Sequence, residues 1–419
     1  MPVADVVLGA LWAWYAYDDA NTARLAKKYK PLALPEKPKY KSTDVSIIIP
    51  TIDTPETFTD CLRLWLANHP REIIIVTIER DLKRVHDLVK PVIAEGDDRI
   101  TLMTADHANK RQQLVAGMKE AKGRILALVD DDAFWSTVEV LPHLLAGFED
   151  PGVGGCVGKQ SLFNSIANRV LTQPYSAHIP RDRRDPAVIT PWEVASLRSL
   201  DNQNNVQAVR FAADGGCFCL VGRTLLMRTE IAQDPEFLHA ITHEYWRGKL
   251  LNTGDDVFVT RWLQAYGWDV SIQNAPEAEI TTHVMRDSDL LRQMVRWQRN
   301  ATQSQLCMVF EKPGFFKLYQ KHPYMARKLI ERLLRPIIAW THIFAFVQGL
   351  RNNSWVAYFV ALWYIWGWAK SYSAFDRRFP WVRSQLWAAF LLDNAHPILD
   401  VYSWLTLSTE AWGTRNEDA

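Results

Sequence analysis

Four short runs rich in β-branched residues recur along the first third of the chain at intervals of 25 to 27 residues, at positions 45–50, 72–78, 99–104 and 124–129. Helical patterns separate the runs, and we expect one helix from Pro55 with Thr54 as its N-cap, one over residues 81–94 and one over residues 108–121. Strands and helices that alternate at this spacing predict βαβ units and a parallel sheet of the nucleotide-binding type. In such sheets ligands bind beyond the carboxyl ends of the strands.

Three consecutive carboxylates, Asp130, Asp131 and Asp132, follow the last of these runs. Neighbouring acids at the end of a buried strand repel one another and lose hydration, so folding alone does not explain them. Along an extended strand, Asp130 and Asp132 would share one face and Asp131 would point the other way. Two such carboxylates suit Mg²⁺ or Mn²⁺, which is often held by one or two acids together with substrate phosphates. The alternative is that the acids cap a helix starting near Ser136.

Composition limits the other classes of function. The chain has 419 residues, and its 48 Lys and Arg nearly balance its 47 Asp and Glu, so its charge does not indicate a nucleic-acid binder. Its five cysteines are scattered and form no Cys-x-x-Cys pair. This spacing argues against a structural zinc site and a disulfide framework, and it suits a reducing compartment.

Two apolar runs near the C-terminus predict a membrane-embedded region. Residues 336–350 and 354–369 contain no charged residue and are bordered by Trp, Tyr, Arg and Lys, and nine of the 18 tryptophans lie beyond residue 336. Each run is shorter than the roughly 20 residues of a straight membrane span, so we expect short or tilted helices. The alternative is a Trp-rich helical domain in solution.

The N-terminal segment is also apolar over residues 3–17, but it lacks the basic start of a standard signal peptide. Basic residues follow it, so that if it inserts into a membrane the rest of the chain is expected in the cytoplasm. Residues 28–41 are rich in Pro and Lys and predict an extended linker.

Two further motifs complete a recognisable pattern. Asp255 and Asp256 precede an amphipathic helix, and residues 293–297 read Gln-x-x-Arg-Trp. An Asp-x-Asp strand end, a Gly-Asp-Asp and a Gln-x-x-Arg-Trp in this order resemble the membrane-integrated family 2 glycosyltransferases, which include hyaluronan, chitin and cellulose synthases. The fungal capsular-polysaccharide and hyaluronan-synthase-like members are the most similar in appearance. The resemblance covers residues 45–300.

The resemblance implies an α/β fold of the GT-A type, with a mixed, mostly parallel sheet, followed by interfacial and transmembrane helices. The expected divisions are an N-terminal segment and linker over residues 1–40, a catalytic domain over 41–298, interfacial amphipathic helices over 299–335, and membrane-embedded helices over 336–419. For residues 299–335 the alternative is an ordinary amphipathic surface helix.

The resemblance also implies roles for single residues. Asp256, or its neighbour Asp255, would be the catalytic base, and Asp132 with Asp130 would hold the metal. Trp297 would form the floor of the acceptor site. The residues that would bind the nucleotide are Pro50, Thr51, Glu79, Lys110, Asp130, Gln293 and Arg296. Glu79 takes its place because the acidic-Gly-Ser turn usual in the family is absent after the second strand.

Two segments have open interpretations. Gly215, Gly216 and Cys217 correspond to the family's acceptor-side loop, although a small packing residue is the favoured interpretation of the cysteine. Asp393, His396 and Asp400 share one face of a predicted helix that contains Pro397, and they would line either a polymer channel or the wet face of an interfacial helix.

The expected enzyme transfers a sugar from a UDP-sugar to a growing polysaccharide, with inversion and with Mn²⁺ or Mg²⁺. It would be an integral membrane protein whose catalytic domain faces the cytoplasm, in contact with membrane lipids. A homo-oligomer is an open alternative to a self-contained channel, because the membrane segments are few. Two alternatives stay open. One is a single transfer to a membrane lipid such as a ceramide or a polyprenyl phosphate, and the other is a catalytically silent scaffold with the same fold.

Overall fold

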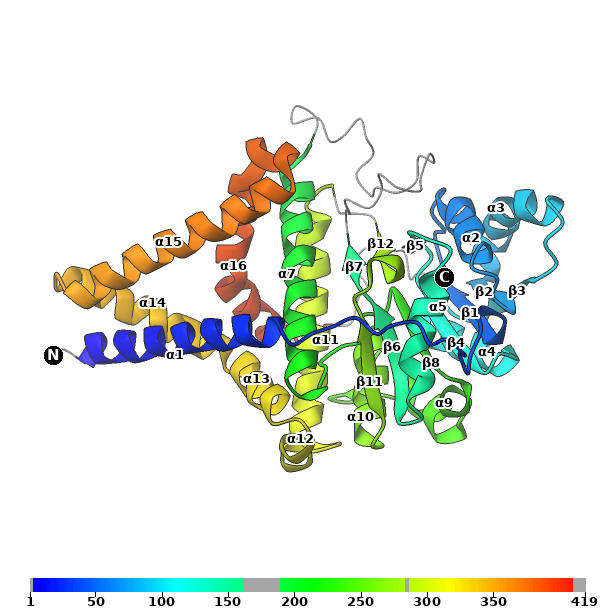
Figure 1. Cartoon of the computed structure of the whole chain (residues 1–419), viewed down its shortest axis with the longest axis horizontal. Coiled ribbons are helices and arrows are strands. Elements are labelled where there is room, and N and C mark those ends of the chain that lie inside the picture. The colour runs from blue at the N-terminus through cyan, green and yellow to red at the C-terminus, as the bar shows by residue number, and fades with distance from the viewer. Residues whose placement is uncertain (1–2, 162–188, 283–285, 410–419) are drawn as a thin grey trace.

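A seven-stranded sheet with the order β11-β6-β8-β4-β1-β2-β3 forms the centre of one half of the molecule (Figure 1). The computed structural model describes residues 3–161, 189–282 and 286–409. The strands are β1 (Val45–Pro50), β2 (Glu72–Ile78), β3 (Ile100–Ala105), β4 (Ile125–Val129), β6 (Val153–Gly158), β8 (Thr224–Arg228) and β11 (Asp269–Gln273). Among these, β8 alone runs antiparallel to its neighbours β4 and β6. The expected mixed, mostly parallel sheet is confirmed.

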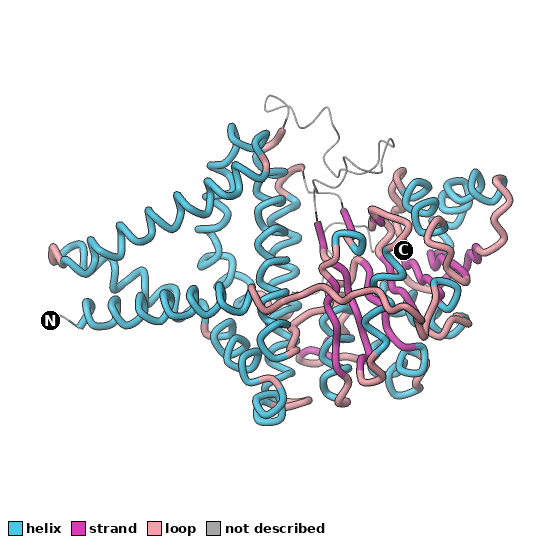
Figure 2. The backbone as a smooth tube through the Cα atoms, viewed as in Figure 1, coloured by secondary structure: helices cyan, strands magenta, loops and turns pink. Residues whose placement is uncertain are grey.

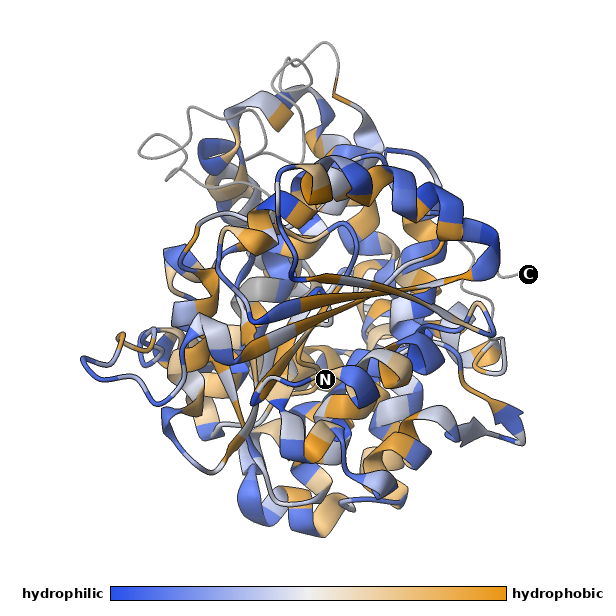
Figure 3. Cartoon of the chain, turned by 90° about the vertical axis from the view of Figure 1, so that its right-hand side faces the viewer, coloured by the Kyte–Doolittle hydropathy of each residue, from blue (hydrophilic) through white to orange (hydrophobic). Residues whose placement is uncertain are grey.

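Both faces of this sheet are covered by helices. Alternate side chains of β1 point to opposite faces: Ile47 and Ile49 pack in one core with Trp65, whereas Ile48 packs in the other with Met118. Figure 3 shows the apolar strands in the middle and helices of mixed polarity around them. The covering helices are α2 (Phe58–Leu66), α3 (Leu82–Ala94), α4 (Lys110–Glu120), α5 (Val140–Leu145), α8 (Thr229–Ala232), α9 (Pro235–Thr242) and α10 (Asp255–Ala265).

Short strands complete this half of the molecule. β5 (Phe134–Trp135), β12 (Ile280–Thr281) and β7 (Gln160–Ser161) form a three-stranded sheet, and β9 (Tyr245–Trp246) pairs with β10 (Lys249–Leu250). Ahead of the sheet, the chain that follows α1 is anchored to β11, because the Tyr29 hydroxyl donates to the Ile272 carbonyl at 2.7 Å.

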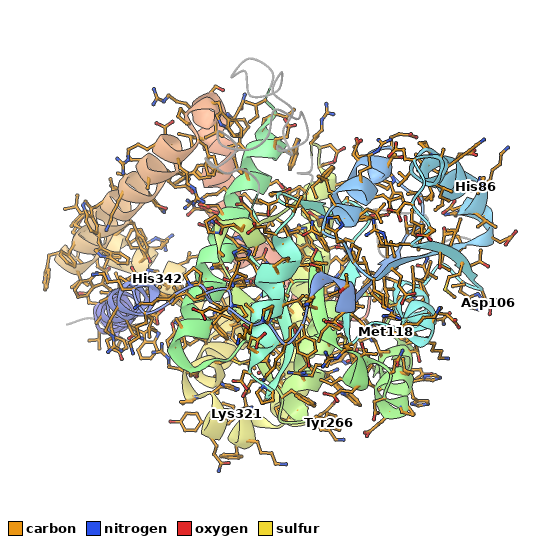
Figure 4. All side chains as sticks on the ribbon, turned by 45° about the vertical axis from the view of Figure 1, so that its right-hand side comes forward. His86, Asp106, Met118, Tyr266, Lys321 and His342 are labelled. Carbon is orange, nitrogen blue, oxygen red and sulfur yellow. The ribbon has the colours of Figure 1, made fainter. Side chains whose placement is uncertain are left out.

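The other half of the molecule is helical (Figure 2). The long helices α7 and α11 stand between the sheet and an arm made of α1, α14 and α15, and Figure 4 labels His342 on this arm and His86 and Asp106 at the opposite end of the molecule. α16 packs against α7, α11 and α14. The bounds are α1 (Val3–Ala26), α7 (Pro191–Asp214), α11 (Asp289–Phe310), α12 (Phe315–Lys321), α13 (Pro323–Leu333), α14 (Arg335–Arg351), α15 (Trp355–Arg378) and α16 (Leu386–Leu405).

No single helix in the described ranges combines the length and apolar character needed to cross a membrane. The helices α13 and α14 meet these criteria only when they are taken together, and they are bent by 62° where they meet.

The four predicted strands are observed within one residue of their expected bounds, and two local expectations are wrong. The first helix begins at Phe58 with Thr57 at its N-cap, because the Thr54 hydroxyl is hydrogen-bonded to that of Thr51 at 2.8 Å. No helix starts near Ser136, since the chain enters β5 and α5 begins only at Val140. Of the predicted divisions, the boundary after residue 298 falls inside the continuous helix α11, and residues 410–419 lie outside the described chain.

Candidate active site

A cavity of about 520 Å³ lies beyond the carboxyl ends of β1 and β4, with α7, α10, α11 and α16 in its walls. It brings together most of the residues singled out in the sequence, although these are spread over more than 200 positions. The predicted site residues in its lining are Pro50, Thr51, Lys110, Asp130, Asp132, Cys217, Asp255, Asp256, Gln293, Arg296 and Trp297.

The end of β1 is held rigidly against the acidic cluster. The Thr51 hydroxyl donates to Asp131 at 2.6 Å, and the Gln113 amide donates to the Thr51 carbonyl at 3.1 Å. Asp131 is buried, with an exposed fraction of 3%. The predicted alternation of an extended strand is not observed, because β4 ends at Val129 and the acids lie in a turn in which the Ala133 amide donates to the Asp130 carbonyl at 3.1 Å. Asp131 lines the cavity together with Asp130 and Asp132.

Lys110, at the start of α4, connects two of the sequence motifs. Its ammonium lies 2.8 Å from Asp130 and 3.1 Å from Asp255, the residues that begin the acidic cluster and helix α10. Burial by itself lowers the pKa of Lys110, but the carboxylates of Asp130 and Asp255 outweigh burial and raise it. Lys110 is therefore a permanent positive charge at the centre of the site.

The acidic cluster offers oxygen donors for a divalent cation. Asp132 accepts a hydrogen bond from Thr282 at 3.2 Å, and both Asp130 and Asp132 line the cavity. In the described part of the chain no group of three or more His, Cys, Asp or Glu is placed to hold a metal ion. Two carboxylates fit Mg²⁺ or Mn²⁺ when substrate phosphates and water supply the remaining ligands, which is the usual way these ions bind to proteins.

Asp256 occupies the first turn of α10 and points into the cavity. Its carboxylate accepts hydrogen bonds from the Val257 amide at 2.8 Å and the Gly222 amide at 3.3 Å, and the Cys219 thiol lies 3.2 Å from it. Loss of hydration in the cavity and the neighbouring charge of Asp255 raise the pKa of Asp256. A carboxylate with a raised pKa and an open side is suited to take up a proton. Gly254, and not Asp256, is the N-cap of this helix.

A buried arginine, Arg111, holds the turn that precedes Asp255 and Asp256. Arg111 donates to the Thr253 carbonyl at 2.7 Å and forms an ion pair with Glu244 at 2.7 Å, and Glu244 also binds Arg261. Gly254 adopts a φ of 74°, a conformation that favours glycine. The backbone of the Gly-Asp-Asp motif is thus held in place by charge-assisted hydrogen bonds.

Helix α11 supplies the third motif. Gln293, Arg296 and Trp297 lie within one helical turn of each other and all line the cavity. Trp297 packs against an apolar cluster that includes Leu197 and Phe379, and the guanidinium of Arg223 lies 5.9 Å from its ring centre. The tryptophan is both a packing residue and part of the cavity wall.

Three predicted residues lie elsewhere. Glu79 is exposed and is not in the cavity lining, because β2 is followed by a short 3₁₀ turn in which the buried Asp81 accepts the Asp53 amide at 2.8 Å. Gly215 ends α7 with a φ of 75°. Gly216 lies against α13, where an added Cβ would approach Met325 within 2.6 Å. Gly215 therefore serves to end the helix and Gly216 allows close packing, whereas Cys217 lines the cavity together with Phe218 and Cys219.

Several other residues of the cavity wall belong to none of the sequence motifs. Arg223 precedes β8 and is close enough to Asp130 and Asp132 for their charges to act on it, while burial lowers its pKa. Polar residues on one face of α7 also line the cavity. Their spacing along the sequence is that of one helix face, and this spacing could have revealed them: Ser199, Asn202, Gln203, Gln207 and Arg210.

The predicted face of α16 also reaches this cavity. Asp393, His396 and Asp400 all line it, and the helix continues through Pro397. Asp393 is paired with Arg198 at 3.0 Å, and Asp400 is bound by two nitrogens of Arg335. These acids are therefore already neutralised by partners.

The fold and the site define a nucleotide-sugar transferase of the GT-A type: a mostly parallel sheet, acids at the ends of its strands, and a second pair of acids facing them across one cavity. A family model described as "Glycosyltransferase like family 2" matches residues 43–300. The chain belongs to this family and is a family 2 glycosyltransferase that uses a nucleotide sugar.

Fungal proteins of known class are similar over nearly the whole chain. The NDP-glycosyltransferase ltbB of Aspergillus luteorubrus is 45% identical over 416 residues, which are 99% of this chain and 98% of that protein. A type 2 glycosyltransferase of Zymoseptoria tritici is 28% identical over 93% of this chain and 79% of its own length.

A solved structure shows the same fold. The mannosyltransferase PcManGT from Pyrobaculum calidifontis, in complex with GDP-Man and Mn²⁺, aligns with a TM-score of 0.59 and 16% identity over 93% of this chain and 99% of its own. The similarity therefore extends past the sheet into the helical half.

Proposed function

We propose that this enzyme transfers a sugar from a nucleoside diphosphate sugar, UDP-sugar in the first instance, to an acceptor hydroxyl with inversion and with the help of a divalent cation. The observation that carries the proposal is the shared cavity: Asp130 and Asp132 line it together with Asp256, and Lys110 joins the two acidic motifs. Donor and acceptor would meet between them.

In this mechanism each motif has its own part. Asp256 would take the proton from the acceptor hydroxyl while that oxygen attacks the anomeric carbon from the face opposite the leaving group. Arg296 and Lys110 would bind the diphosphate, the arginine as a planar fork and the lysine as a point charge. Gln293 would hydrogen-bond nearby, and Trp297 would offer an apolar surface to the acceptor. A cation held by Asp130 and Asp132 would neutralise charge on the leaving diphosphate.

Release of nucleoside diphosphate tests this proposal directly. Purified full-length protein in detergent would be incubated with Mn²⁺ and a panel of donors that includes UDP-glucose, UDP-N-acetylglucosamine and GDP-mannose. We expect metal-dependent release of the diphosphate from at least one donor, and its suppression by a chelator. Release that is unaffected by the chelator would contradict the metal dependence, and no release from any donor would contradict the donor class.

The length of the product decides between two acceptors. A growing polysaccharide, made processively, is the first candidate, and it is supported by a cavity that continues from the acidic motifs to the polar face of α16. A single transfer to a membrane lipid is the second candidate, and the arginines that line the helical part of the cavity, Arg210, Arg332 and Arg335, support it because they suit a phosphate-bearing acceptor. Mass spectrometry of the product separates a ladder of sugar additions from one addition.

For the location we propose that the arm of α1, α14 and α15 embeds in a membrane, with the catalytic domain on the cytoplasmic side. Large apolar side chains on the arm are more than half exposed, and such a patch on a soluble surface is unusual. They include Ile337, Phe344, Trp355, Leu362 and Trp366. The Lys370 ammonium lies 5.1 Å from the Trp366 ring, a pairing of cation and aromatic ring suited to the lipid interface.

Flotation with lipid vesicles measures this association. The full-length protein is expected to float with vesicles of phosphatidylcholine and phosphatidylserine and to stay with them in high salt. The double substitution Phe344→Glu and Leu362→Glu changes two exposed side chains of the arm and should leave most of the protein unbound. Phe316→Glu, on the exposed face of α12, is the matched control and should float like the wild type. Equal flotation of all three proteins would contradict insertion by the arm.

A further inference from the structure

The helical end of the cavity carries more positive charge than its acids neutralise. We define this end by Arg210 of α7, Gln298 and Gln305 of α11, Arg332 of α13, Arg335 of α14 and Asp400 of α16, all of which line the cavity. Arg335 is bound to Asp400, and the other acid of α16 is bound to Arg198. Both carboxylates that α16 brings to this region are therefore already engaged.

Arg210 and Arg332 lack such a partner among the described residues. Neither guanidinium has a carboxylate oxygen of this part of the chain within ion-pair distance, and Arg332 donates a long hydrogen bond of 3.5 Å to the Gln298 amide oxygen. The buried Nε of Arg332 has no hydrogen-bond partner there. The Arg210 guanidinium lies 4.4 Å from the ring centre of Phe218. Arg332 is also near enough to Arg335 and Arg210 for their charges to repel its own.

Two buried guanidinium groups that face one cavity are costly unless an anion joins them. Burial, and repulsion from Arg335, lower the pKa of Arg210 to about 10. In the proposed mechanism the donor diphosphate is bound by Lys110 and Arg296, two other residues of the cavity lining. A second anion of matching charge is therefore needed here, and a phosphate monoester, with a charge of roughly −1.5 to −2 at neutral pH, matches two guanidinium groups.

The position of the two arginines relative to the proposed base, Asp256, indicates that the acceptor is the substrate that carries the second anion. Arg332 and Cys219 line the same cavity, and the Cys219 thiol lies 3.2 Å from the Asp256 carboxylate. Gln305, in the same lining, is buried, and neither its amide oxygen nor its amide nitrogen has a hydrogen-bond partner in the described part of the chain. An amide with a free donor and a free acceptor suits the hydroxyl groups of a polyol.

We infer that the acceptor is a phosphorylated polyol, whose phosphate binds between Arg210 and Arg332 while one of its hydroxyls reaches Asp256. This inference rests on the proposed function, and it adds the chemical class of the acceptor. The same chemistry exists in a soluble polyol phosphate and in the head group of a phospholipid, and the experiment distinguishes these two sources.

The test is a binding measurement with full-length protein in detergent whose donor site is saturated with UDP and Mn²⁺. The soluble probe is sn-glycerol 3-phosphate, and glycerol is its uncharged control. The lipid probe is phosphatidylcholine vesicles that contain phosphatidic acid, and vesicles without phosphatidic acid are its control. We expect the wild type to bind the phosphate-bearing probe but not its control. Arg210→Gln and Arg332→Gln should each weaken that binding about 10- to 100-fold, as expected for loss of a charged hydrogen bond.

Nucleotide binding shows whether the variants are folded. UDP and Mn²⁺ should bind equally well to both glutamine variants, and Arg332→Lys should retain part of the phosphate affinity because it keeps the charge. Arg292→Gln, which removes an exposed arginine from the same helix as Gln305, is the matched control and should bind like the wild type.

Each result has one interpretation. Binding of glycerol 3-phosphate that is lost in the variants supports a soluble acceptor, and binding only to phosphatidic acid vesicles, lost in the same variants, supports a lipid acceptor. If neither phosphate probe binds, or if the glutamine variants bind it like the wild type, the inference is overturned. Failure of UDP with Mn²⁺ to bind to the wild type would refute the proposed function instead.

Discussion

Asp256→Asn is expected to retain donor binding while transfer to the acceptor falls by about 10²- to 10⁴-fold, the usual contribution of a general base. The substitution keeps the size of the side chain, and the oxygen of asparagine can still accept the Val257 amide. Lys110, Asp130 and Arg296, which would hold the donor, are unchanged. Isothermal titration with nucleoside diphosphate and Mn²⁺ measures the first effect, and a transfer assay measures the second.

The dependence on pH gives this prediction a second readout. Because the pKa of Asp256 is raised, wild-type transfer should decline as the pH falls through that raised value and the carboxylate becomes protonated. The asparagine variant should lack this acidic limb. Asp289→Asn, on the exposed start of α11, is the control. Parallel loss of nucleotide binding and transfer would show that Asp256 is not the base and would direct attention to Asp255.

Asp132→Asn should lower the Mn²⁺-dependent affinity for a nucleoside diphosphate about a hundredfold or more, because one of the two carboxylates proposed to hold the cation loses its charge. The fold should persist, since an asparagine oxygen can still accept the Thr282 hydroxyl. Titration with UDP in the presence and absence of Mn²⁺ separates the metal-dependent part of the affinity. Metal-dependent binding equal to that of the wild type would remove Asp132 from the cation site.

Local sequence patterns predicted the catalytic half of the fold well. The β-branched runs at 45–50 and 124–129 became β1 and β4 because burial on both faces of a sheet requires continuous apolar strands. The acids after β4 line the cavity because ligands bind at the carboxyl edge of parallel strands in such sheets. These are consequences of short-range pattern and topology.

Other parts of the site depend on contacts between distant segments. Gly216 was expected at the acceptor, but its neighbour is Met325, and no local pattern announces that helix α13 packs there. Glu79 was expected at the nucleotide base, but the turn after β2 leaves it exposed and buries Asp81 instead. Arg210 and Arg332 are 122 positions apart, so that only the packing of α7 against α13 makes them neighbours.

The continuity of α11 has a mechanical consequence. A helix of 22 residues rises about 33 Å, and this single rod carries Arg296 in its third turn and packs against α12 and α13. No loop interrupts it at residue 298, where a joint between modules was expected. Arg296 and the surface that packs against α12 and α13 therefore belong to one rigid element, which stands between the sheet and the arm (Figure 1). If the arm rests in a bilayer, the cavity wall and the helices packed against it move over the lipid surface as one body.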